Sequence, residues 1–266
     1  MTNTANSLVT TEVIGQVGLM RFNNLEKLNT LDVPMLLAME DALTGLERDA
    51  QVRVIVVTGA DDRAFIAGGN IKALNARRGL QHYGEFAEVV HRVFRRFEVC
   101  AKPTIAAVNS WALGGGMEFM LTIDIRLMAH EAKIGLPEIK LGLFPGGGGS
   151  QRLMRQLSLC QAKLLMFTGD FLDAHEAVTL GLVNNAVPRA FLLAETLKLA
   201  NSIAEKSPVA LKFLKSSMLF GAEMSWKLPS RTKLPPSALC SIAMTRMRGA
   251  ARLLASESRI SKDGSC

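Results

Sequence analysis

Short apolar runs, rich in β-branched residues, alternate along the chain with longer segments of helical periodicity. Residues 52–57 (VRVIVV) and 103–108 (PTIAAV) are short and mostly apolar, which is typical of strands buried in a sheet. Residues 124–129 predict a third such strand, and 186–188 end a fourth. Helices are predicted at 82–98, 150–156, 160–168, 174–180 and 190–206. The alternation predicts an α/β fold.

The first part of the chain predicts a β-hairpin followed by a capped helix. Residues 9–22 alternate apolar and polar side chains, and Gly15 with Gln16 supplies the turn. Asp32 has the side chain of an N-cap residue, and Pro34 suits the first turn of a helix. Apolar residues then recur at helical spacing: Leu36, Leu37, Met39, Leu43 and Leu46.

The composition fits a globular protein. Of the 266 residues, 48% are hydrophobic and 21% are charged, so the chain can bury a large core. No window approaches the roughly 20 consecutive apolar residues of a membrane span, and the polar N-terminus lacks the pattern of a secretory signal. We therefore expect a cytoplasmic protein with no membrane partner. The cysteines are far apart and predict neither disulfides nor a metal site: Cys100, Cys160, Cys240 and Cys266.

The excess positive charge lies at the C-terminal end. The formal net charge is +7, and residues 225–266 hold 8 of the 31 Lys and Arg but only 2 of the 24 Asp and Glu. The rest of the chain is nearly neutral. Binding of nucleic acid or an anionic surface by this tail is a remote alternative function, because Trp226 is the only aromatic residue in the tail.

Two glycine-rich loops each follow a strand and precede a helical segment. They are 64–72 (AFIAGGNIK) and 111–118 (WALGGGME). Glycine lets a ligand approach the backbone closely, and the first N–H groups of a helix have no acceptor within it. Two such loops facing each other would stabilise an oxyanion, although tight turns or close packing would explain either loop alone. Neither loop matches a P-loop or a G-x-G-x-x-G motif.

Two glutamates stand among apolar neighbours. Glu118 directly follows the triple glycine, and Glu138 lies within 135–139 (GLPEI). Burial raises the pKa of a carboxyl group, and general acid–base chemistry near neutral pH requires such a raised pKa. A surface residue or a carboxylate at a helix start is the alternative interpretation of each glutamate taken alone.

Three stretches resemble the enoyl-CoA hydratase/isomerase, or crotonase, family, in order and spacing. They are 64–72, 109–118 and 135–153 (GLPEIKLGLFPGGGGSQRL). Further similarity extends to about residue 220. The resemblance implies a crotonase-like spiral of repeated ββα units with a C-terminal helical region, divided into a core domain, 1–200, and a helical region, 201–266. It also implies a homo-oligomer, either a trimer or a dimer of trimers.

The resemblance further implies an acyl-CoA substrate, of which coenzyme A is a part, and no metal or redox cofactor. The backbone amides of Gly69 and Gly115 match those that hold the thioester oxygen in an oxyanion hole. Glu118 and Glu138 match the carboxylates that activate a water and move a proton. Candidates for substrate contacts lie after the hairpin and along the first loop: Lys27, Leu28, Ala67, Gly68, Asn70, Ile71 and Lys72.

The presence of both glutamates favours hydration of a trans-2-enoyl-CoA to a 3-hydroxyacyl-CoA. Delta-isomerisation of an enoyl-CoA, or another acyl-CoA reaction of the family, is the alternative. The chain departs from the family at Asn70, where many relatives have Asp, at Ser110, where Gly is usual, and at Gly147, where Ala is frequent. Asn70 removes a charge beside the first loop, and Ser110 would crowd a backbone of positive φ. The acyl chain length and the pathway stay open.

The tail, 225–266, does not follow the pattern of the family's C-terminal helices. It contains 8 Ser and 3 of the 9 Pro. Its back-translated codons, read two nucleotides later, can encode peptides typical of the family's C-terminus at three places in one frame. We hypothesise a frameshift near residue 225. With the tail as written we expect weaker oligomerisation and lower activity, because in relatives these helices cover part of the CoA site and form the trimer interface.

Overall fold

The computed structural model describes residues 7–75 and 83–223. The chain divides into two compact units, Met1–Ala204 and Glu205–Cys266. Within the second unit the described residues form α10 (Pro208–Glu223). The frameshift and the basic-tail hypotheses concern residues outside the described ranges. The division into a core domain and a C-terminal region at residue 200 stays a prediction.

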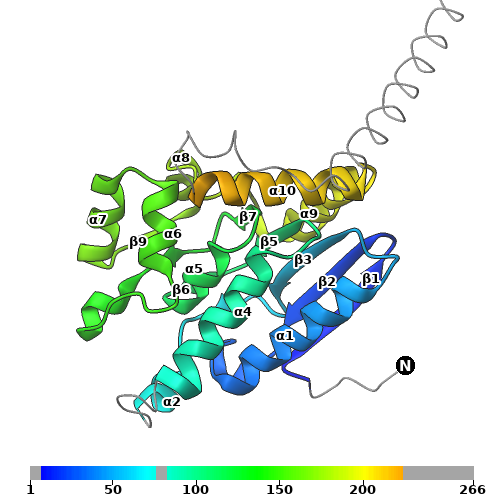
Figure 1. The fold of residues 1–266 in the computed structure, drawn as a ribbon. Coiled ribbons are helices and arrows are strands. Elements are labelled where there is room, and N and C mark those ends of the chain that lie inside the picture. The colour runs from blue at the N-terminus through cyan, green and yellow to red at the C-terminus, as the bar shows by residue number, and fades with distance from the viewer. Residues whose placement is uncertain (1–6, 76–82, 224–266) are drawn as a thin grey trace, which may run out of the picture. The chain divides into compact units, whose positions relative to one another are not determined.

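A six-stranded sheet of order β1-β2-β3-β5-β7-β10 forms the centre of the first unit (Figure 1). Its first two strands pair as the predicted antiparallel hairpin, which turns at Gly15. The other neighbours are parallel, and β3 and β5 are buried along their whole length. The strands are β1 (Val9–Ile14), β2 (Val17–Phe22), β3 (Val54–Gly59), β5 (Thr104–Val108), β7 (Ile125–Ala129) and β10 (Asn185–Val187). All the predicted strands of this sheet are therefore confirmed.

A second sheet has the order β4-β6-β8-β9, and the residue pattern did not locate its strands, although the family resemblance implies two strands in each repeat. Its strands are β4 (Ala64–Ile66), β6 (Trp111–Leu113), β8 (Ile134–Gly135) and β9 (Phe171–Leu172). The assignment of 64–66 and 111–113 to loops was wrong. Strands of two or three residues are too short to show a hydrophobic period, so the sequence pattern does not reveal them.

The chain alternates between the two sheets as it advances. A strand of the large sheet leads to one of the small sheet three times, β3 to β4, β5 to β6 and β7 to β8. Each pair is followed by a helical segment: α2 (Ile71–Asn75), α5 (Gly115–Met120) or the 3-10 helix η3 (Pro137–Leu141). This repetition confirms the predicted spiral of ββα units. Because β4, β6 and β8 are neighbours, the turns that follow them lie side by side.

Longer helices cover the two sheets. Asp32 caps α1 (Val33–Arg48) by accepting the N–H of Met35, and Pro34 lies in its first turn, as predicted. The helix α1 packs against α4 (Glu88–Glu98), and α9 (Arg189–Ala204) packs against β3, β5 and β7. The other helical segments are η1 (Leu25–Lys27), η2 (Tyr83–Ala87), α6 (Gly149–Gln156), α7 (Leu159–Thr168) and α8 (Ala174–Thr179). Among the described residues, no helix is long and apolar enough to cross a membrane.

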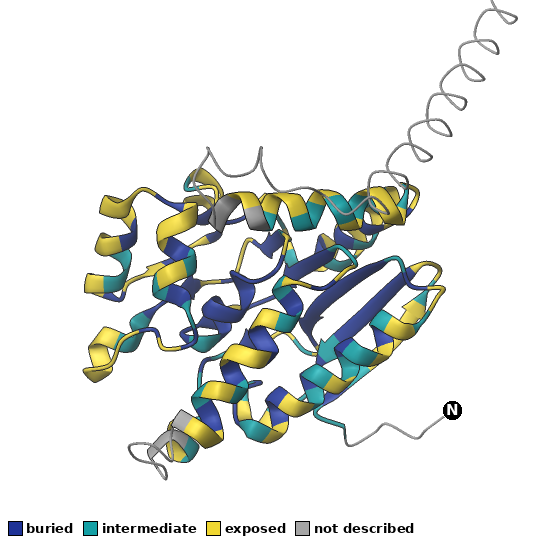
Figure 2. Ribbon diagram, in the orientation of Figure 1, coloured by how far each residue is buried: buried dark blue, intermediate teal, exposed yellow. Residues whose placement is uncertain are grey.

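An aromatic cluster fixes α5 in the core, where Figure 2 shows the buried residues concentrated on the strands and the inner sides of the helices. The ring centroid of Phe119 lies 4.8 Å from that of Phe97 and 5.5 Å from that of Phe94. The rings of Phe22 and Phe65 follow at 5.6 and 6.3 Å. All five side chains are fully buried. Such aromatic contacts hold α5 in one orientation and so direct the side chain that precedes Phe119.

Candidate active site

The first glycine loop is held by the segment that follows η1. The N–H of Ala67 donates to the carbonyl of Leu28 over 3.1 Å. The N–H of Leu31 donates to the carbonyl of Gly68, and that of Asn70 to the carbonyl of Leu31, each over 2.8 Å. Gly68 has a φ of +109°, which strains any residue with a Cβ. The backbone of this loop is therefore tied down on both sides of its second glycine.

The second glycine loop packs tightly against the end of β4, where the first glycine loop begins. Gly114 has a φ of +51° and donates its N–H to the carbonyl of Gly135 over 2.8 Å. A Cβ on Gly116 would overlap the carbonyl of Ile66. Glycine at position 116 therefore lets α5 lie directly against the end of β4.

The two loops bring the backbone of Gly69 next to that of Gly115. A Cβ on Gly115 would lie 3.8 Å from the nitrogen of Gly69. Within the described part of the chain, neither residue donates its N–H in a hydrogen bond. Gly115 is the first residue of α5, where the helix itself offers no acceptor. Two backbone donors without acceptors at one place can stabilise developing negative charge.

Glu118 is buried on the first turn of α5, with 4% of its surface exposed. Its Oε1 accepts the N–H of Gly149 over 2.8 Å. Burial raises the pKa of Glu118 to about 7, while the backbone of Gly149 and that of Gly147 act to lower it. The charge of Glu138 also raises this pKa, so the two carboxyl groups lie close enough to interact.

Glu138 lies in η3, against the second glycine loop. Its Oε1 would be 3.0 Å from a Cβ on Gly114, the residue next to Gly115. Its Oε2 is buried without a hydrogen-bond partner among the described residues, and burial raises the pKa of the group. A buried carboxyl oxygen without a partner is unfavourable unless a water or a ligand forms a hydrogen bond with it.

The structure thus places the four central predicted residues together. Gly114 lies between two of these parts, because a Cβ there would be 3.0 Å from Oε1 of Glu138 and 3.9 Å from Cα of Gly68 in the first loop. The arrangement combines two backbone donors with two carboxyl groups of raised pKa. It can therefore stabilise an oxyanion and transfer protons at one place.

Asn70 belongs to a polar network at the edge of the first loop. Its amide nitrogen donates to Oδ2 of Asp32 over 3.4 Å, and its Oδ1 accepts the N–H of Ala73 over 3.2 Å. Lys27 places its Nζ 3.6 Å from the same Oδ2. An aspartate at position 70 would put a second negative charge beside Asp32, so the amide suits this network.

The remaining predicted contact residues lie along the same loop. Ala67 and Gly68 are fixed by backbone hydrogen bonds, and Leu28, which receives one of them, has a φ of +51°. Ile71 and Lys72 are exposed at the start of α2. Leu28 therefore lies against the loop that carries Gly69, and the other four residues are part of that loop.

The expected backbone crowding at Ser110 is wrong. Among the described residues other than glycine, only Leu28 and Asn29 have positive φ. Ser110 is buried just before β6 without that strain. Glycine at position 147 has a clearer reason, since a Cβ there would lie 2.8 Å from Oε2 of Glu118.

Asn29 organises the first loop and carries no signal in the sequence. It is 1% exposed and has a φ of +57°. Its side-chain amide donates to the carbonyls of Ala64 and Phe65 over 3.0 and 3.1 Å, and its Oδ1 accepts the N–H of Asn24. These partners are distant in sequence, so only the fold reveals the role. The glycine run that holds Glu118 is likewise recognisable only from the fold.

Known proteins share both the sequence and the fold of the chain. The family model described as enoyl-CoA hydratase/isomerase matches residues 12–233. A short-chain-enoyl-CoA hydratase of Clostridium acetobutylicum is 37% identical over 209 residues, which cover 79% of this chain and 80% of that protein. A crotonyl-CoA hydratase of Syntrophomonas wolfei is 38% identical over 208 residues, which cover 76% of this chain and 77% of that protein.

The solved structures agree with these matches. An enoyl-CoA hydratase from Bacillus anthracis superimposes with a TM-score of 0.82 and 28% identity over 96% of each chain. An enoyl-CoA hydratase from Thermoplasma volcanium has a TM-score of 0.80 and 28% identity. The family model spans most of the chain and the glycine loops and glutamates described above, and the chain belongs to the enoyl-CoA hydratase/isomerase family.

Proposed function

We propose that the chain is an enoyl-CoA hydratase that adds water across the double bond of a trans-2-enoyl-CoA to give a 3-hydroxyacyl-CoA. The observation that carries the proposal is the convergence of the Gly69 and Gly115 amides with the carboxyl groups of Glu118 and Glu138. The names of the two curated relatives support the same reaction.

The two backbone amides are proposed to form the oxyanion hole. The thioester oxygen would accept the N–H groups of Gly69 and Gly115. Attack of water at C3 builds enolate-like charge on this oxygen, so donors fixed in advance stabilise the transition state. Removal of one such donor in other enzymes lowers the rate by roughly 10²–10³-fold.

The two glutamates are proposed to hold the reacting water and to move its protons. The water oxygen bonds to C3, one carboxylate takes a proton from this water, and the other carboxyl group gives a proton to C2. This scheme requires the pair to hold one proton, and the pKa of Glu118 near 7 favours that state around neutral pH. C3 gains a bond to oxygen and C2 gains a bond to hydrogen, so the oxidation of one carbon balances the reduction of the other and the step requires no redox cofactor.

The remaining predicted residues are proposed to bind the substrate. The exposed amines of Lys27 and Lys72 suit the phosphates of coenzyme A. The first loop would lie along the thioester and the pantetheine chain through Ala67, Gly68, Asn70 and Ile71, with Leu28 beside it. The names of the relatives make the four-carbon crotonyl-CoA the first substrate to test.

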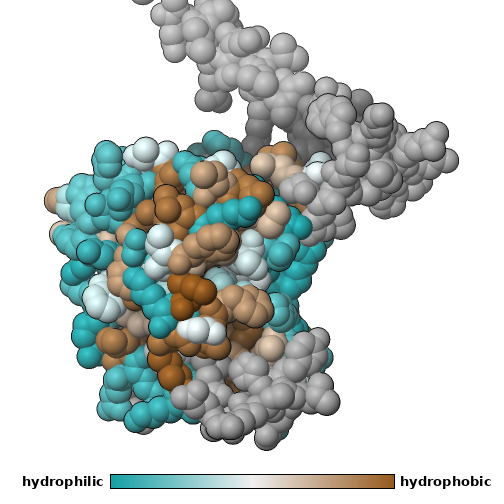
Figure 3. Space-filling view, turned by 90° about the vertical axis from the view of Figure 1, so that its left-hand side faces the viewer, coloured by the Kyte–Doolittle hydropathy of each residue, from teal (hydrophilic) through white to brown (hydrophobic). Residues whose placement is uncertain are grey.

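We also infer a homo-oligomer, a trimer or a dimer of trimers. Apolar side chains gather on the side of the first unit that Figure 3 faces. In the segments from η3 to α7, Phe144 and Phe167 are 76% and 72% exposed. The other exposed large apolar residues of these segments are Ile139, Leu141, Leu143, Met154, Leu159 and Leu164. An exposed apolar patch of this kind is typical of an interaction surface. Sedimentation of the full chain tests this inference, and a monomer at micromolar concentration contradicts it.

A cytoplasmic location stays a prediction.

An assay of the full chain tests the reaction. We expect saturable loss of the conjugated enoyl thioester absorbance of crotonyl-CoA and formation of 3-hydroxybutyryl-CoA. A chain that isomerises a 3-enoyl-CoA but does not hydrate the 2-enoyl-CoA would support the isomerase alternative and contradict the proposal.

A further inference from the structure

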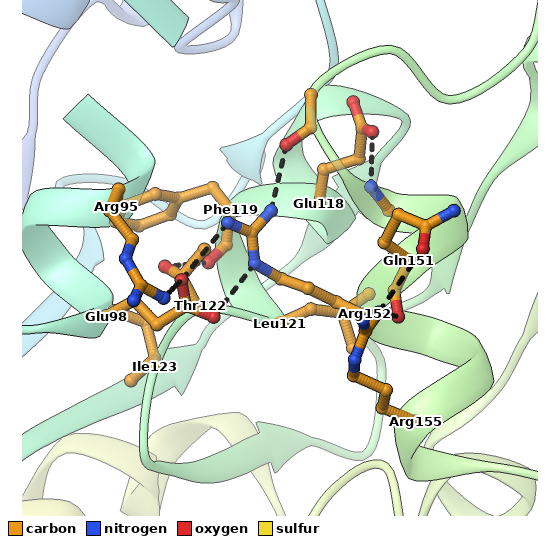
Figure 4. Close-up of polar contacts among 12 residues, drawn as sticks. Arg95, Glu98, Glu118, Phe119, Leu121, Thr122, Ile123, Gln151, Arg152 and Arg155 are labelled. Carbon is orange, nitrogen blue, oxygen red and sulfur yellow. Dashed lines mark hydrogen bonds and ion pairs between the residues drawn. The ribbon is translucent and has the colours of Figure 1, made fainter. Parts of the chain in front are cut away.

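A paired arginine and glutamate lie behind Glu118 and take no direct part in the proposed reaction. Arg152 of α6 meets Glu98, the last residue of α4, with Nε 3.2 Å from Oε1 and Nη2 3.3 Å from Oε2 (Figure 4). The two side chains are 16% and 18% exposed. Two parallel hydrogen bonds from a guanidinium to a carboxylate fix the orientation of both groups.

Glu98 is held as a carboxylate by its surroundings. Arg95 donates to its Oε2 over 3.0 Å from one turn earlier in α4. Burial alone would raise the pKa of Glu98, but the hydrogen bonds and positive charges of Arg152 and Arg95 outweigh this and hold the pKa below its ordinary value. The anchor of Arg152 is therefore charged at every pH at which the enzyme would work.

The third nitrogen of Arg152 reaches back to the loop that precedes its own helix. Its Nη1 donates to the carbonyl of Gly147 over 2.9 Å. Gly148, with a φ of +97°, lies against the guanidinium so closely that a Cβ would collide with it. The same loop ends at Gly149, whose N–H holds Oε1 of Glu118. A continuous set of contacts thus runs from Glu98 to the carboxyl of Glu118.

We propose that Arg152, anchored by Glu98, is a positioning residue that fixes the loop of Gly147–Gly149 and thereby holds the carboxyl of Glu118 in its reactive orientation. This inference rests on the proposed hydratase function. The loop has no side chains of its own to anchor it, so its conformation depends on what its backbone contacts. Arg152 supplies such a contact at Gly147, and Gly147 itself borders the carboxyl of Glu118.

The same arginine also acts on the charge of Glu118. The charged groups that act on Glu118 are Glu138 from η3, which raises its pKa, and Arg152 from α6, which lowers it. Arg152 therefore opposes the effect of burial and keeps the carboxyl titratable near neutral pH. A purely structural residue would not change this titration.

Three variants of the full chain separate these effects. Arg152→Lys keeps the positive charge but loses the two parallel hydrogen bonds of the guanidinium to Glu98. We therefore expect kcat to fall about 10²-fold with little change in KM, as is typical when a reacting group is misplaced by about 1 Å. Arg152→Gln also removes the positive charge that lowers the pKa of Glu118. The change in kcat with pH that reflects this group, near pH 7, should therefore move to higher pH. Glu98→Gln keeps the shape of the anchor and should give a smaller fall in kcat.

The matched control is Arg155→Lys in the same helix. Arg155 is exposed and donates to Gln151, so its replacement should leave kcat and the pH profile unchanged. Thermal melting of each variant reports on folding separately. Variants at 152 that lower the melting temperature but keep the wild-type kcat per folded enzyme and the wild-type pH profile would overturn the inference. Absence of hydration by the wild-type chain would instead contradict the proposed function.

Discussion

The backbone N–H of Gly149 donates a 2.8 Å hydrogen bond to Oε1 of Glu118, 31 residues earlier in the chain. The first residue of α6 thus holds a carboxyl that α5 buries. One oxygen of Glu118 is fixed by this bond, and the other lies near Gly147. The site therefore depends on a glycine loop that comes after both of the loops that carry Gly69 and Gly115.

Replacing Gly149 by alanine should misplace Glu118. A Cβ there would lie 2.7 Å from Cγ of Glu118 and 3.2 Å from Cβ of Pro145, so the glutamate must move. We expect Gly149→Ala to lower kcat about 10²-fold in the hydration assay. Gly146→Ala is the control, because its nearest neighbour would be 3.9 Å away, and it should keep its activity. Equal activity of both variants would show that the Gly149 contact does not matter.

A substitution that disturbs the close packing between the two glycine loops should lower the free energy of unfolding. A Cβ on Gly116 would overlap the backbone of Ile66, which cannot move away as a flexible side chain could. We expect Gly116→Ala to destabilise the fold by about 3 kcal/mol in urea unfolding. Gly45→Ala, at an exposed position in the last turn of α1 where a Cβ meets nothing within 4 Å, should instead stabilise it by about 0.5–1 kcal/mol. A neutral Gly116→Ala would contradict the packing described for α5.

Stability should fall as Glu118 loses its proton. Its pKa is about 7 in the folded chain, whereas the ordinary value of a glutamate is 4.5, so between these pH values the folded state binds more protons than the unfolded state. The stability gained from the neutral form is present below pH 4.5 and is lost as the pH rises through 7. From pH 5 to pH 8 this one group should remove about 2–3 kcal/mol.

The variant Glu118→Gln isolates that effect, because its amide is neutral at both pH values. Urea unfolding of the wild type and the variant at pH 5 and pH 8 gives the difference. The variant should lose less stability than the wild type between the two. Parallel losses would mean that Glu118 titrates near its ordinary pKa.

Asn29 should be needed for the first loop. Asn29→Asp keeps the size of the side chain but removes the donors to the carbonyls of Ala64 and Phe65. We expect a loss of about 1–3 kcal/mol in stability, because buried acceptors lose their partners, together with a lower kcat. Asn185→Asp at an exposed strand position is the control and should behave as the wild type. A wild-type kcat in Asn29→Asp would show that the loop keeps its shape without this contact.

The strands β3, β5 and β7 could be predicted from the sequence because each is five or six residues long and mostly apolar. The hairpin of β1 and β2 could be predicted from the alternation of apolar and polar side chains around its turn. The small sheet could not, since β8 and β9 have two residues each. Their existence follows from the spiral, in which a short segment pairs with its neighbour from the previous turn. The hydrophobic periodicity of a short segment does not predict such pairing with a distant segment.

The burial of Glu118 could be anticipated from its apolar neighbours Met117 and Phe119, which the structure buries with it. The contacts of Asn29 and Arg152 could not. Asn29 bonds to residues 35 and 36 positions away, and Arg152 to a residue 54 positions away. Side-chain partners at such distances are set by the tertiary fold, so a single sequence does not identify them.

The kinetics of Glu118→Gln, Glu138→Gln and the double variant on crotonyl-CoA test the central claim most directly. If both carboxyl groups act on one water, each single variant should lower kcat by about 10²–10⁴-fold, and the double variant should be little worse than the poorer single one. All three should melt at or above the wild-type temperature at pH 8. Full hydration activity in either single variant would contradict the claim that the two glutamates work as a pair.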